Sequence, residues 1–300
     1  MKQVTSIGEI LFDVYPDRRT LGGAPFNFIY HIIKLTGKGS FVSRIGNDPA
    51  GNAVLKFLTD KGIPKKHIQI DSFHPTGESV AFLDKKKIPV WKIKTGTAYD
   101  FIELNDEIEQ LINNNTDCLY FGTLAQRDIK TRSTIQHLFN RNLKYFCDLN
   151  IRQDFYSKNL IHECLKACDV LKLNIDEFHL VNNLLLNKNF VANKSAERLQ
   201  AEYGISLLCI TYGDQGATIY QGNRSSHYEL KMENVVDTVG AGDAYAAIFC
   251  IGYLNNWDIE KINEIASAFA GEIVKINGAL PEEEILYEKY KQVVDEFSEY

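Results

Sequence analysis

Short apolar runs typical of strands alternate with helical patterns along most of this 300-residue chain. The first strand is predicted at Val4–Ile7, and a helix with Pro25 near its start is predicted over residues 25–36. Further strands are expected at 39–43, 117–121, 145–149, 169–173 and 206–211. Further helices are expected at 49–61, 128–141, 158–168, 175–186 and 193–203. From Gly242 onward the chain is expected to be mostly helical, and it ends in a charged helix over 282–300. This alternation predicts an α/β fold in which helices cover both faces of a mainly parallel sheet, a three-layer sandwich.

Two parts of the chain interrupt the alternation. Residues 79–83 and 90–93 each have the period of two that is typical of a strand, and a lysine-rich turn with Pro89 joins them. Residues 9–20 also look extended. We expect these pieces to form a small β-sheet that projects from the main body; the competing interpretation is an ordinary edge hairpin.

Composition and charge narrow the classes of function. The chain is 45% apolar and 24% charged, which is normal for a globular protein, and its net charge of −6 argues against nucleic acid as the main partner. No stretch approaches about 18 apolar residues, so no membrane span is expected. The six cysteines lie mostly in apolar segments and lack metal-ligand spacing, which is typical of buried thiols in a reducing compartment. Because the start of the chain has no apolar signal region, we expect a cytoplasmic protein.

The most informative motif is the run Asp237–Asp243, which reads D-T-V-G-A-G-D. An alanine-rich apolar run follows it, so a glycine turn opens a buried helix that has Asp243 in its first turn. Gly240 and Gly242 allow close approach to the backbone, and a helix N-terminus attracts anions. A phosphate-sized anion site with a carboxylate base beside it is what phosphoryl transfer to an alcohol requires. The competing interpretation is that the aspartate only stabilises the helix end.

Two other common nucleotide motifs do not occur in the sequence. Tyr245 stands where G-x-G-x-x-G would need its third glycine, and no strand leads directly into Gly240. A dinucleotide-binding oxidoreductase is therefore disfavoured. The Walker-type pattern G-x-x-x-x-G-K-[S/T] is also absent.

Polar residues gather where predicted strands end, which is where open α/β sheets bind ligands. Asp13 follows the first strand and can accept hydrogen bonds from sugar hydroxyls, or it is a surface charge. A second glycine loop with Gly22, Gly23 and Asn27 feeds the next helix, and alone it is equally consistent with a turn. Arg152 follows a later strand and can pair with an anionic group.

Two further strand ends carry candidate nucleotide and metal residues. Asn174 and Glu177 can hold a hydrated Mg²⁺ near phosphates, or they can form a capping box at a helix start. Thr211, Gly213 and Gly216 form another strand-end glycine turn, which can line a nucleotide or be a tight turn.

Taken in order, these motifs resemble those of the ribokinase-like sugar kinases of the phosphofructokinase-B type, over nearly the whole chain. The early pair of motifs is similar to the fructokinase branch in particular. The matching segments are Gly8–Asp13 (G-E-x-L-x-D), Gly22–Asn27 (G-G-A-P-x-N), Gly46–Gly51 (G-x-D-x-x-G), Asn174–Glu177 (N-x-x-E) and Asp237–Asp243 (D-T-x-G-A-G-D).

The resemblance implies one kinase domain over residues 1–300, with a lid from about 9–20 and 73–100 inserted in the α/β body. It implies transfer of the γ-phosphoryl group of ATP to a sugar hydroxyl, with Mg²⁺, and leaves open a monovalent cation such as K⁺ and a homodimer through the lid. Fructose is the expected sugar. The alternatives are 2-keto-3-deoxygluconate, ribose or a nucleoside, and, in another class, a catalytically silent sugar- or nucleotide-binding regulatory protein.

The resemblance also implies a role for individual residues. Asp243 is similar to the catalytic base, and the amides of Gly240, Ala241 and Gly242 are similar to the anion hole. The implied sugar contacts are Asp13, Gly22, Gly23 and Asn27; the implied cofactor residues are Asn174, Thr211, Gly213, Gly216 and Asn277; and Glu177 would hold the metal through water. To these we add Arg152 as a candidate sugar contact and Lys172 as a candidate cofactor residue. A sequence alone leaves open whether Arg152 and Lys172 touch a ligand.

Two departures from the family pattern concern the sugar pocket. Phe26 and Phe28 stand where related fructokinases often have small residues, so they either narrow the pocket or only repack the helix. The segment 97–100 resembles a sugar-kinase A-D motif with one residue inserted.

Overall fold

The computed structural model describes residues 2–83, 89–139, 141–229, 234–282 and 284–298. A large sheet of nine strands runs through these described residues, in the order β13-β12-β11-β10-β9-β8-β1-β4-β5. The strands are β1 (Val4–Ile7), β4 (Ser40–Gly46), β5 (Ile68–Asp71), β8 (Cys118–Phe121), β9 (Lys144–Asp148), β10 (Val170–Asn174), β11 (Leu207–Thr211), β12 (Ala217–Gln221) and β13 (Arg224–Tyr228). All neighbours from β5 to β11 are parallel, and β12 and β13 are antiparallel additions. The predicted mainly parallel sheet is therefore confirmed.

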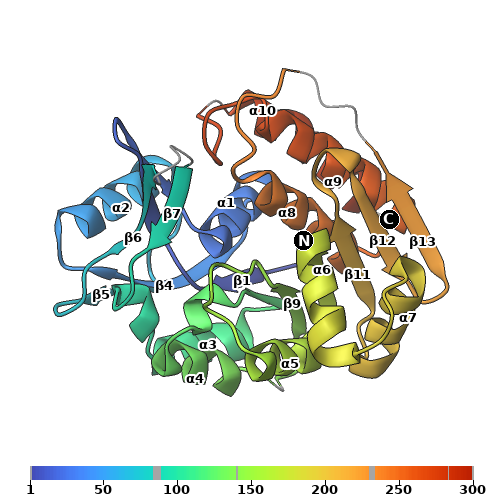
Figure 1. Ribbon diagram of the computed structural model, residues 1–300. Coiled ribbons are helices and arrows are strands. Elements are labelled where there is room, and N and C mark those ends of the chain that lie inside the picture. Colours follow the sequence, from blue (N-terminus) through green and yellow to red (C-terminus); the bar gives the residue numbers. More distant parts are fainter. Residues whose placement is uncertain (1, 84–88, 140, 230–233, 283, 299–300) are drawn as a thin grey trace.

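Helices cover both faces of this sheet (Figure 1). One face carries α1 (Ala24–Thr36), α2 (Pro49–Asp60), α8 (Ala241–Leu254), α9 (Ile259–Ile273) and α10 (Ile285–Ser298). The other carries α3 (Asp106–Asn114), α4 (Ile129–His137), α5 (Lys158–Ala167), α6 (Ile175–Val181) and α7 (Ala192–Tyr203). Each face has its own cluster of buried apolar side chains, because each helix buries one face against the sheet. The expected three-layer architecture is thus confirmed.

A second, smaller sheet stands apart from the large one, on the left in Figure 1. Its strand order is β3-β2-β6-β7, with β2 (Leu11–Val14), β3 (Arg19–Gly22), β6 (Gly77–Leu83) and β7 (Pro89–Ile93). The β6–β7 hairpin pairs through β6 with β2, in parallel, so that Leu11 lies opposite Gly77. The predicted small sheet is confirmed, and the edge-hairpin alternative is wrong. The lysine-rich turn at 85–87 lies outside the described residues.

Several element ends differ from the prediction. Helix α4 ends at His137 rather than 141, and α10 begins at Ile285 rather than 282. Helix α6 ends at Val181, after which residues 182–186 form a wider π-type turn. Strand β13 was not predicted, because its sequence R-S-S-H-Y lacks the apolar alternation of a half-buried strand.

The G-x-D-x-x-G segment joins β4 to α2. Asp48 is the N-cap of α2, and its carboxylate accepts hydrogen bonds from the Gly51 amide at 2.7 Å and the Thr76 amide at 2.8 Å. A Cβ on Gly51 would overlap the Gly46 carbonyl, so both glycines are needed for close packing. This motif therefore anchors α2 to the chain just before β6.

Two composition-based expectations concern cysteines and membrane spans. All six cysteines are buried and free, as expected. Within the described ranges, none of the helices has the length and apolarity required to cross a bilayer.

Candidate active site

The glycine turn of Asp237–Asp243 opens α8 as predicted. Gly240 is the N-cap of α8 with φ +81°, a conformation that favours glycine, and a Cβ there would overlap Ala279. Asp237 accepts hydrogen bonds from the amides of Val239 (3.0 Å) and Gly278 (3.1 Å). The structure therefore holds the loop that contains Asn277 against the start of α8. Ala241 and Gly242 lie at the accessible first turn of the helix, where free N–H groups can bind an anion.

Asp243 is half-buried in the first turn of α8 and faces α1. Asn27 of α1 donates a hydrogen bond of 2.8 Å from Nδ2 to Oδ2 of Asp243. Burial raises the pKa of Asp243 to about 6, against the lowering effect of this hydrogen bond. A carboxyl with that pKa is ionised near neutral pH and still basic enough to accept a proton. Oδ1 of Asn27 is buried and makes no hydrogen bond within the described part of the chain, so it is available to a ligand.

Lys172 on β10 lies beside the same helix end. Its Nζ is 2.8 Å from Oδ2 of Asp148, the last residue of β9, and 3.6 Å from where a Cβ on Gly242 would lie. Burial alone would lower the pKa of Lys172, but the Asp148 carboxylate raises it, so the ammonium stays charged. Asp148 falls within the strand predicted at 145–149 and had no predicted role; its pairing with Lys172 across neighbouring parallel strands is visible only in the structure.

The predicted sugar-binding residues lie near Asp243 and the start of α8. Asp13 lies on β2, and burial raises its pKa to about 6, while the Ser79 hydroxyl and the Arg152 charge lower it. Arg152 is exposed, and its positive charge lowers the pKa of Asp243 as well as that of Asp13. Gly22 packs against Asp13, since a Cβ there would be 3.0 Å from Oδ2. Gly23, with φ +113°, is the N-cap of α1 and contacts the backbone of the chain that follows β1.

Glu9 was quoted within a motif but was given no role by sequence reasoning. Its side chain is 2% exposed, and its charge interacts with Asp243 and Arg152. Burial raises its pKa to about 7. The sequence feature that could have indicated a role for Glu9 in the site was its position directly after the first strand, next to Gly8.

Asn174 and Glu177 form the capping box that was the alternative to a metal site. Oδ1 of Asn174 accepts from the Glu177 amide at 2.8 Å, and Oε2 of Glu177 accepts from the Asn174 amide at 2.8 Å. Oε1 of Glu177 accepts from the Ile151 amide at 2.7 Å. Each carboxylate oxygen keeps a second lone pair, which suits a metal-bound water better than direct ligation. Within the ranges described above, no group of three or more His, Cys, Asp or Glu residues could hold a metal ion.

In the turn after β11, the structure requires a glycine at one of the two predicted positions. Gly216 has φ +84°, and a Cβ there would overlap the Tyr228 carbonyl of β13. Gly213 has φ +65° with open space around it, and the Thr211 hydroxyl donates to the Leu173 carbonyl at 3.4 Å. The contact of this turn with a nucleotide stays a prediction.

The two departures from the family pattern affect packing. Phe26 and Phe28 are completely buried, and Phe28 stacks on Tyr120 with ring centroids 3.8 Å apart, so the two phenylalanines repack the helix rather than line the pocket. In segment 97–100, Asp100 forms a buried ion pair with Arg127, with Nε 2.7 Å from Oδ1.

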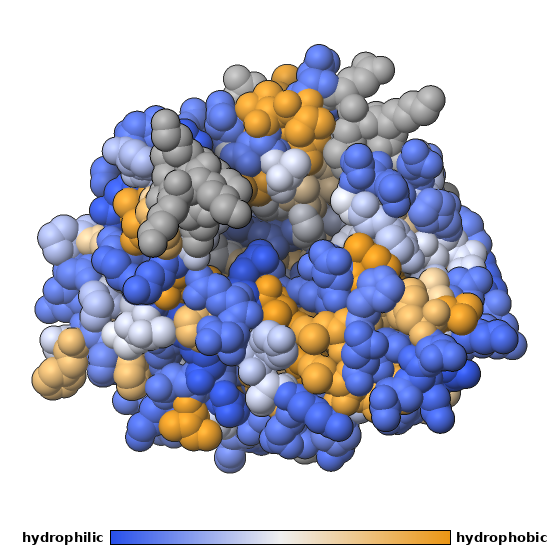
Figure 2. Space-filling model, viewed as in Figure 1, coloured by the Kyte–Doolittle hydropathy of each residue, from blue (hydrophilic) through white to orange (hydrophobic). Residues whose placement is uncertain are grey.

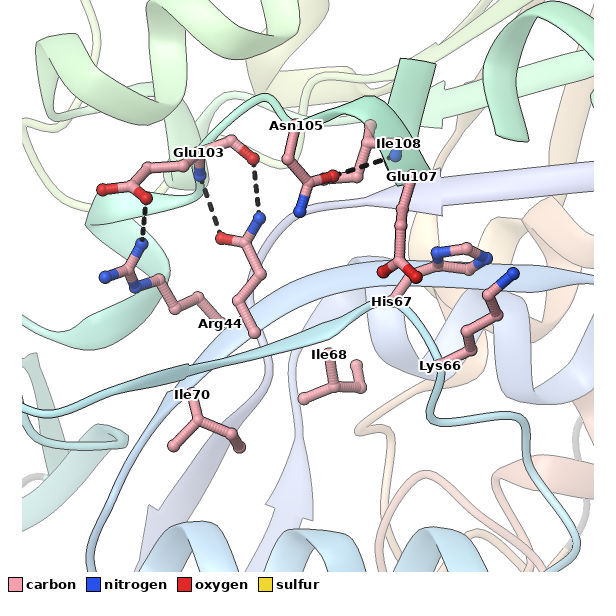
Figure 3. A pocket seen from close by; sticks show the side chains of 10 residues that line it. Arg44, Lys66, His67, Ile68, Ile70, Glu103, Asn105, Glu107 and Ile108 are labelled. Carbon is pink, nitrogen blue, oxygen red and sulfur yellow. Dashed lines mark hydrogen bonds and ion pairs between the residues drawn. The ribbon is translucent and has the colours of Figure 1, made fainter. Parts of the chain in front are cut away.

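Figure 2 shows a hollow between the small sheet and the main body, on the face drawn in Figure 1. A cavity of about 740 Å³ lies beside Asn277, between the end of α9 and the start of α10. Another, of about 330 Å³, lies along β5 and contains none of the predicted site residues (Figure 3). Its lining includes Arg44, Gln69 and Glu103, which are already bonded to one another or to the backbone.

The chain is similar in sequence to known carbohydrate kinases. A family model described as pfkB family carbohydrate kinase matches residues 1–284. The ATP-dependent 6-phosphofructokinase of Thermoanaerobacterium thermosaccharolyticum is 26% identical over 298 residues, covering 92% of this chain and 89% of the relative. A fructokinase of Escherichia coli is 26% identical over 296 residues, covering 93% and 95%.

Solved structures share the fold. The crystal structure of a fructokinase with bound ATP from Xylella fastidiosa has a TM-score of 0.82 and 18% identity over 99% of this chain and 100% of that chain. That of a ribokinase from Thermotoga maritima has a TM-score of 0.77 and 20% identity over 97% and 100%. The fold is therefore ribokinase-like, as expected. Because the family model spans nearly the whole chain, the protein belongs to the pfkB family of carbohydrate kinases and is an ATP-dependent sugar kinase.

Proposed function

We propose that the protein is a fructokinase in which Asp243 is the general base. The observation that carries the base assignment is the position of Asp243 in the first turn of α8, half-buried, with its pKa raised to about 6 and its orientation fixed by Asn27. The choice of fructose is supported by the two early motifs, residues 8–13 and 22–27, which are similar to the fructokinase branch.

In this proposal, groups of the protein bind the sugar, accept the proton of its reacting hydroxyl and stabilise the transferring phosphoryl group. Asp243 accepts the proton of the hydroxyl as its oxygen attacks, and Asp13 and Asn27 hold the sugar. The amides of Gly240–Gly242 stabilise the negative charge on the transferring group, and Lys172 adds a nearby cation. Bound ATP supplies the phosphoryl group. Glu177 fits the role of holding a hydrated Mg²⁺ through water, because its oxygens keep free lone pairs.

The nucleotide side is also part of the proposal. Lys172 lies within β10 and Asn174 ends it, while Thr211 ends the neighbouring strand β11 and is followed by Gly213 and Gly216. The cavity of about 740 Å³ beside Asn277 is within the size range of small-molecule sites. The loop containing Asn277 is tied to the start of α8, which supports a nucleotide position continuous with the anion site.

We also propose that residues 1–300 form one kinase domain in which the small sheet closes over the sugar. A homodimer through that sheet, a dependence on K⁺ and a cytoplasmic location belong to the same proposal. The buried free cysteines support a reducing compartment, and the net charge of −6 supports a protein without a nucleic acid partner.

The test is release of ADP from Mg·ATP with a panel of sugars headed by D-fructose, using Asp243→Asn as control. Turnover that requires fructose and is lost in the variant would support the fructokinase. A higher kcat/KM with 2-keto-3-deoxygluconate, ribose or a nucleoside would keep the mechanism and change the substrate. Full activity of Asp243→Asn would remove Asp243 from the role of base.

A further inference from the structure

Glu9 is a buried carboxylate that the proposed reaction does not use. It lies between β1 and β2 and is 2% exposed. Its Oε2 atom is fully buried and makes no hydrogen bond with any residue that the structure describes. A buried polar atom without a partner is costly and calls for an explanation. One explanation is that Oε2 is the acceptor for a group of the substrate.

The neighbours of Glu9 place it in the sugar region of the site. Its charge interacts with those of Arg152, Asp243 and Arg127. Asp243 is the proposed base, and Arg152 is a predicted sugar contact. The backbone of Glu9 packs against the second glycine loop, since a Cβ on Gly23 would be 2.6 Å from its carbonyl oxygen. Glu9 therefore lies among the residues that would surround the sugar.

Arg127 contributes a second unpaired buried atom near Glu9. Its Nε and Nη2 atoms bind the Asp100 carboxylate at 2.7 and 2.8 Å, and the guanidinium packs against the rings of Tyr99 and Phe155. Nη1 is buried and has no hydrogen-bond partner in the described ranges. Because Asp100 balances the charge of Arg127, Nη1 can serve as a donor to a neutral hydroxyl without leaving an excess positive charge.

The balance of charge around Glu9 favours a neutral ligand. Three carboxylates, those of Glu9, Asp13 and Asp243, interact with the exposed Arg152. The two buried cations nearby are each already engaged with an aspartate. A carboxylate or phosphate on the sugar would add negative charge to a region where carboxylates outnumber the available cation.

We propose that Glu9 is a substrate-binding residue that accepts a hydrogen bond from a hydroxyl of a neutral sugar and selects against sugar acids and sugar phosphates. The proposal rests on the proposed position of the sugar beside Asp243. Because burial raises the pKa of Glu9 to about 7, the ionised form, which only accepts hydrogen bonds, increases as the pH rises above neutrality.

The test compares wild type and Glu9→Gln on D-fructose, 2-keto-3-deoxygluconate and D-fructose 6-phosphate at saturating Mg·ATP. We expect the variant to raise KM for fructose by about 10- to 100-fold, with a smaller change in kcat, because the neutral amide accepts a weaker hydrogen bond than the carboxylate and places an NH2 donor where one carboxylate oxygen was. The preference for the neutral sugar should fall by about tenfold. In wild type, KM for fructose should decrease as pH rises through 7, and this dependence should be absent in Glu9→Gln.

The matched control is Glu103→Gln, because the Glu103 side chain is 72% exposed and lines the separate cavity of Figure 3. It should leave KM and the sugar preference unchanged. Circular dichroism checks that each variant is folded, and Glu9→Met, which keeps the length of the side chain, replaces Glu9→Gln if the latter is not.

Two results would overturn the proposal while leaving the kinase mechanism intact. One is an unchanged KM and preference in Glu9→Gln; the other is a wild-type preference for the sugar acid or the sugar phosphate. If no sugar is phosphorylated, the proposed fructokinase fails, and calorimetric titration of fructose then tests Glu9 separately. Weaker binding to Glu9→Gln than to wild type supports the role; equal binding, or none by either protein, overturns it.

Discussion

Asn27 and Asp243 are 216 positions apart in the chain, yet Nδ2 of Asn27 donates a 2.8 Å hydrogen bond to Oδ2 of Asp243. Each residue lies near the start of a helix that follows a glycine loop, α1 in one case and α8 in the other. The two glycine loops therefore converge, and the first orients the carboxylate of the second.

Replacing Asp243 by Asn should lower kcat by about 10²- to 10⁴-fold, the range expected for a positioned base. The amide has the same shape and its oxygen can still accept the hydrogen bond from Asn27, but it cannot take up the proton of the hydroxyl. Steady-state rates give kcat, and calorimetry should show nearly unchanged ATP binding. Near-normal turnover in a folded variant would contradict this prediction.

Replacing Asn27 by Leu should move the acid limb of the kcat profile, measured at saturating sugar, to higher pH. In wild type, activity should fall as pH drops through about 6, because protonated Asp243 cannot act as a base. The hydrogen bond from Asn27 lowers the pKa of Asp243, so its loss raises that pKa. The alkaline limb of the same profile is the internal control. An acid limb that stays in place would argue against coupling between the two residues.

Replacing Glu9 by Gln should stabilise the unliganded protein at high pH only. The folded state raises the pKa of Glu9 from 4.5 to about 7, so it favours the protonated form. The free energy of unfolding of wild type therefore carries a penalty that is absent below pH 4.5, grows between 4.5 and 7, and then stays constant. At pH 8 the gain in Glu9→Gln should approach about 3 kcal/mol, and at pH 4 it should be near zero.

Urea unfolding at the two pH values measures this difference, with Glu103→Gln as the matched substitution at an exposed carboxylate. A gain of equal size at pH 4 and pH 8 would show that the effect does not come from the charge of Glu9.

The two glycines of the G-A-G turn should respond differently to alanine. Gly240→Ala should lower the free energy of unfolding by about 1–3 kcal/mol or more, because Gly240 has φ +81° and a Cβ would overlap Ala279. Gly242→Ala places its Cβ 3.6 Å from Lys172 Nζ, an ordinary contact, and should raise stability by about 0.5–1 kcal/mol through helix propensity. Thermal or urea unfolding compares them directly; equal losses would contradict the distinction.

Local patterns in the sequence were enough to predict the parallel sheet and several helix starts. The capping box of Asn174 and Glu177 could be recognised in the sequence, as one of two alternatives, because a cap depends only on residues a few positions away. The same locality explains why Asp243 could be assigned to the first turn of its helix.

The missed features depend on contacts between distant segments. Asp148 meets Lys172 only because β9 and β10 are neighbours in the sheet, and a single sequence does not give strand order. Glu9 is an acidic residue, a type that is rarely buried, and nothing near it in the sequence indicates that its side chain is enclosed. Strand β13 was missed because an edge strand with a polar sequence lacks the usual pattern.

The boundary between the two sheets also divides the site. Asp13 is part of β2 in the small sheet, whereas Glu9 precedes that sheet and Asp243 and Asn27 belong to helices packed on the large one. A rotation of the small sheet would therefore carry Asp13 and leave the other three residues stationary. If the small sheet closes over the sugar as proposed, the base would stay with the large sheet while the small sheet brings in one carboxylate, and the complete set of sugar contacts would form only on closure.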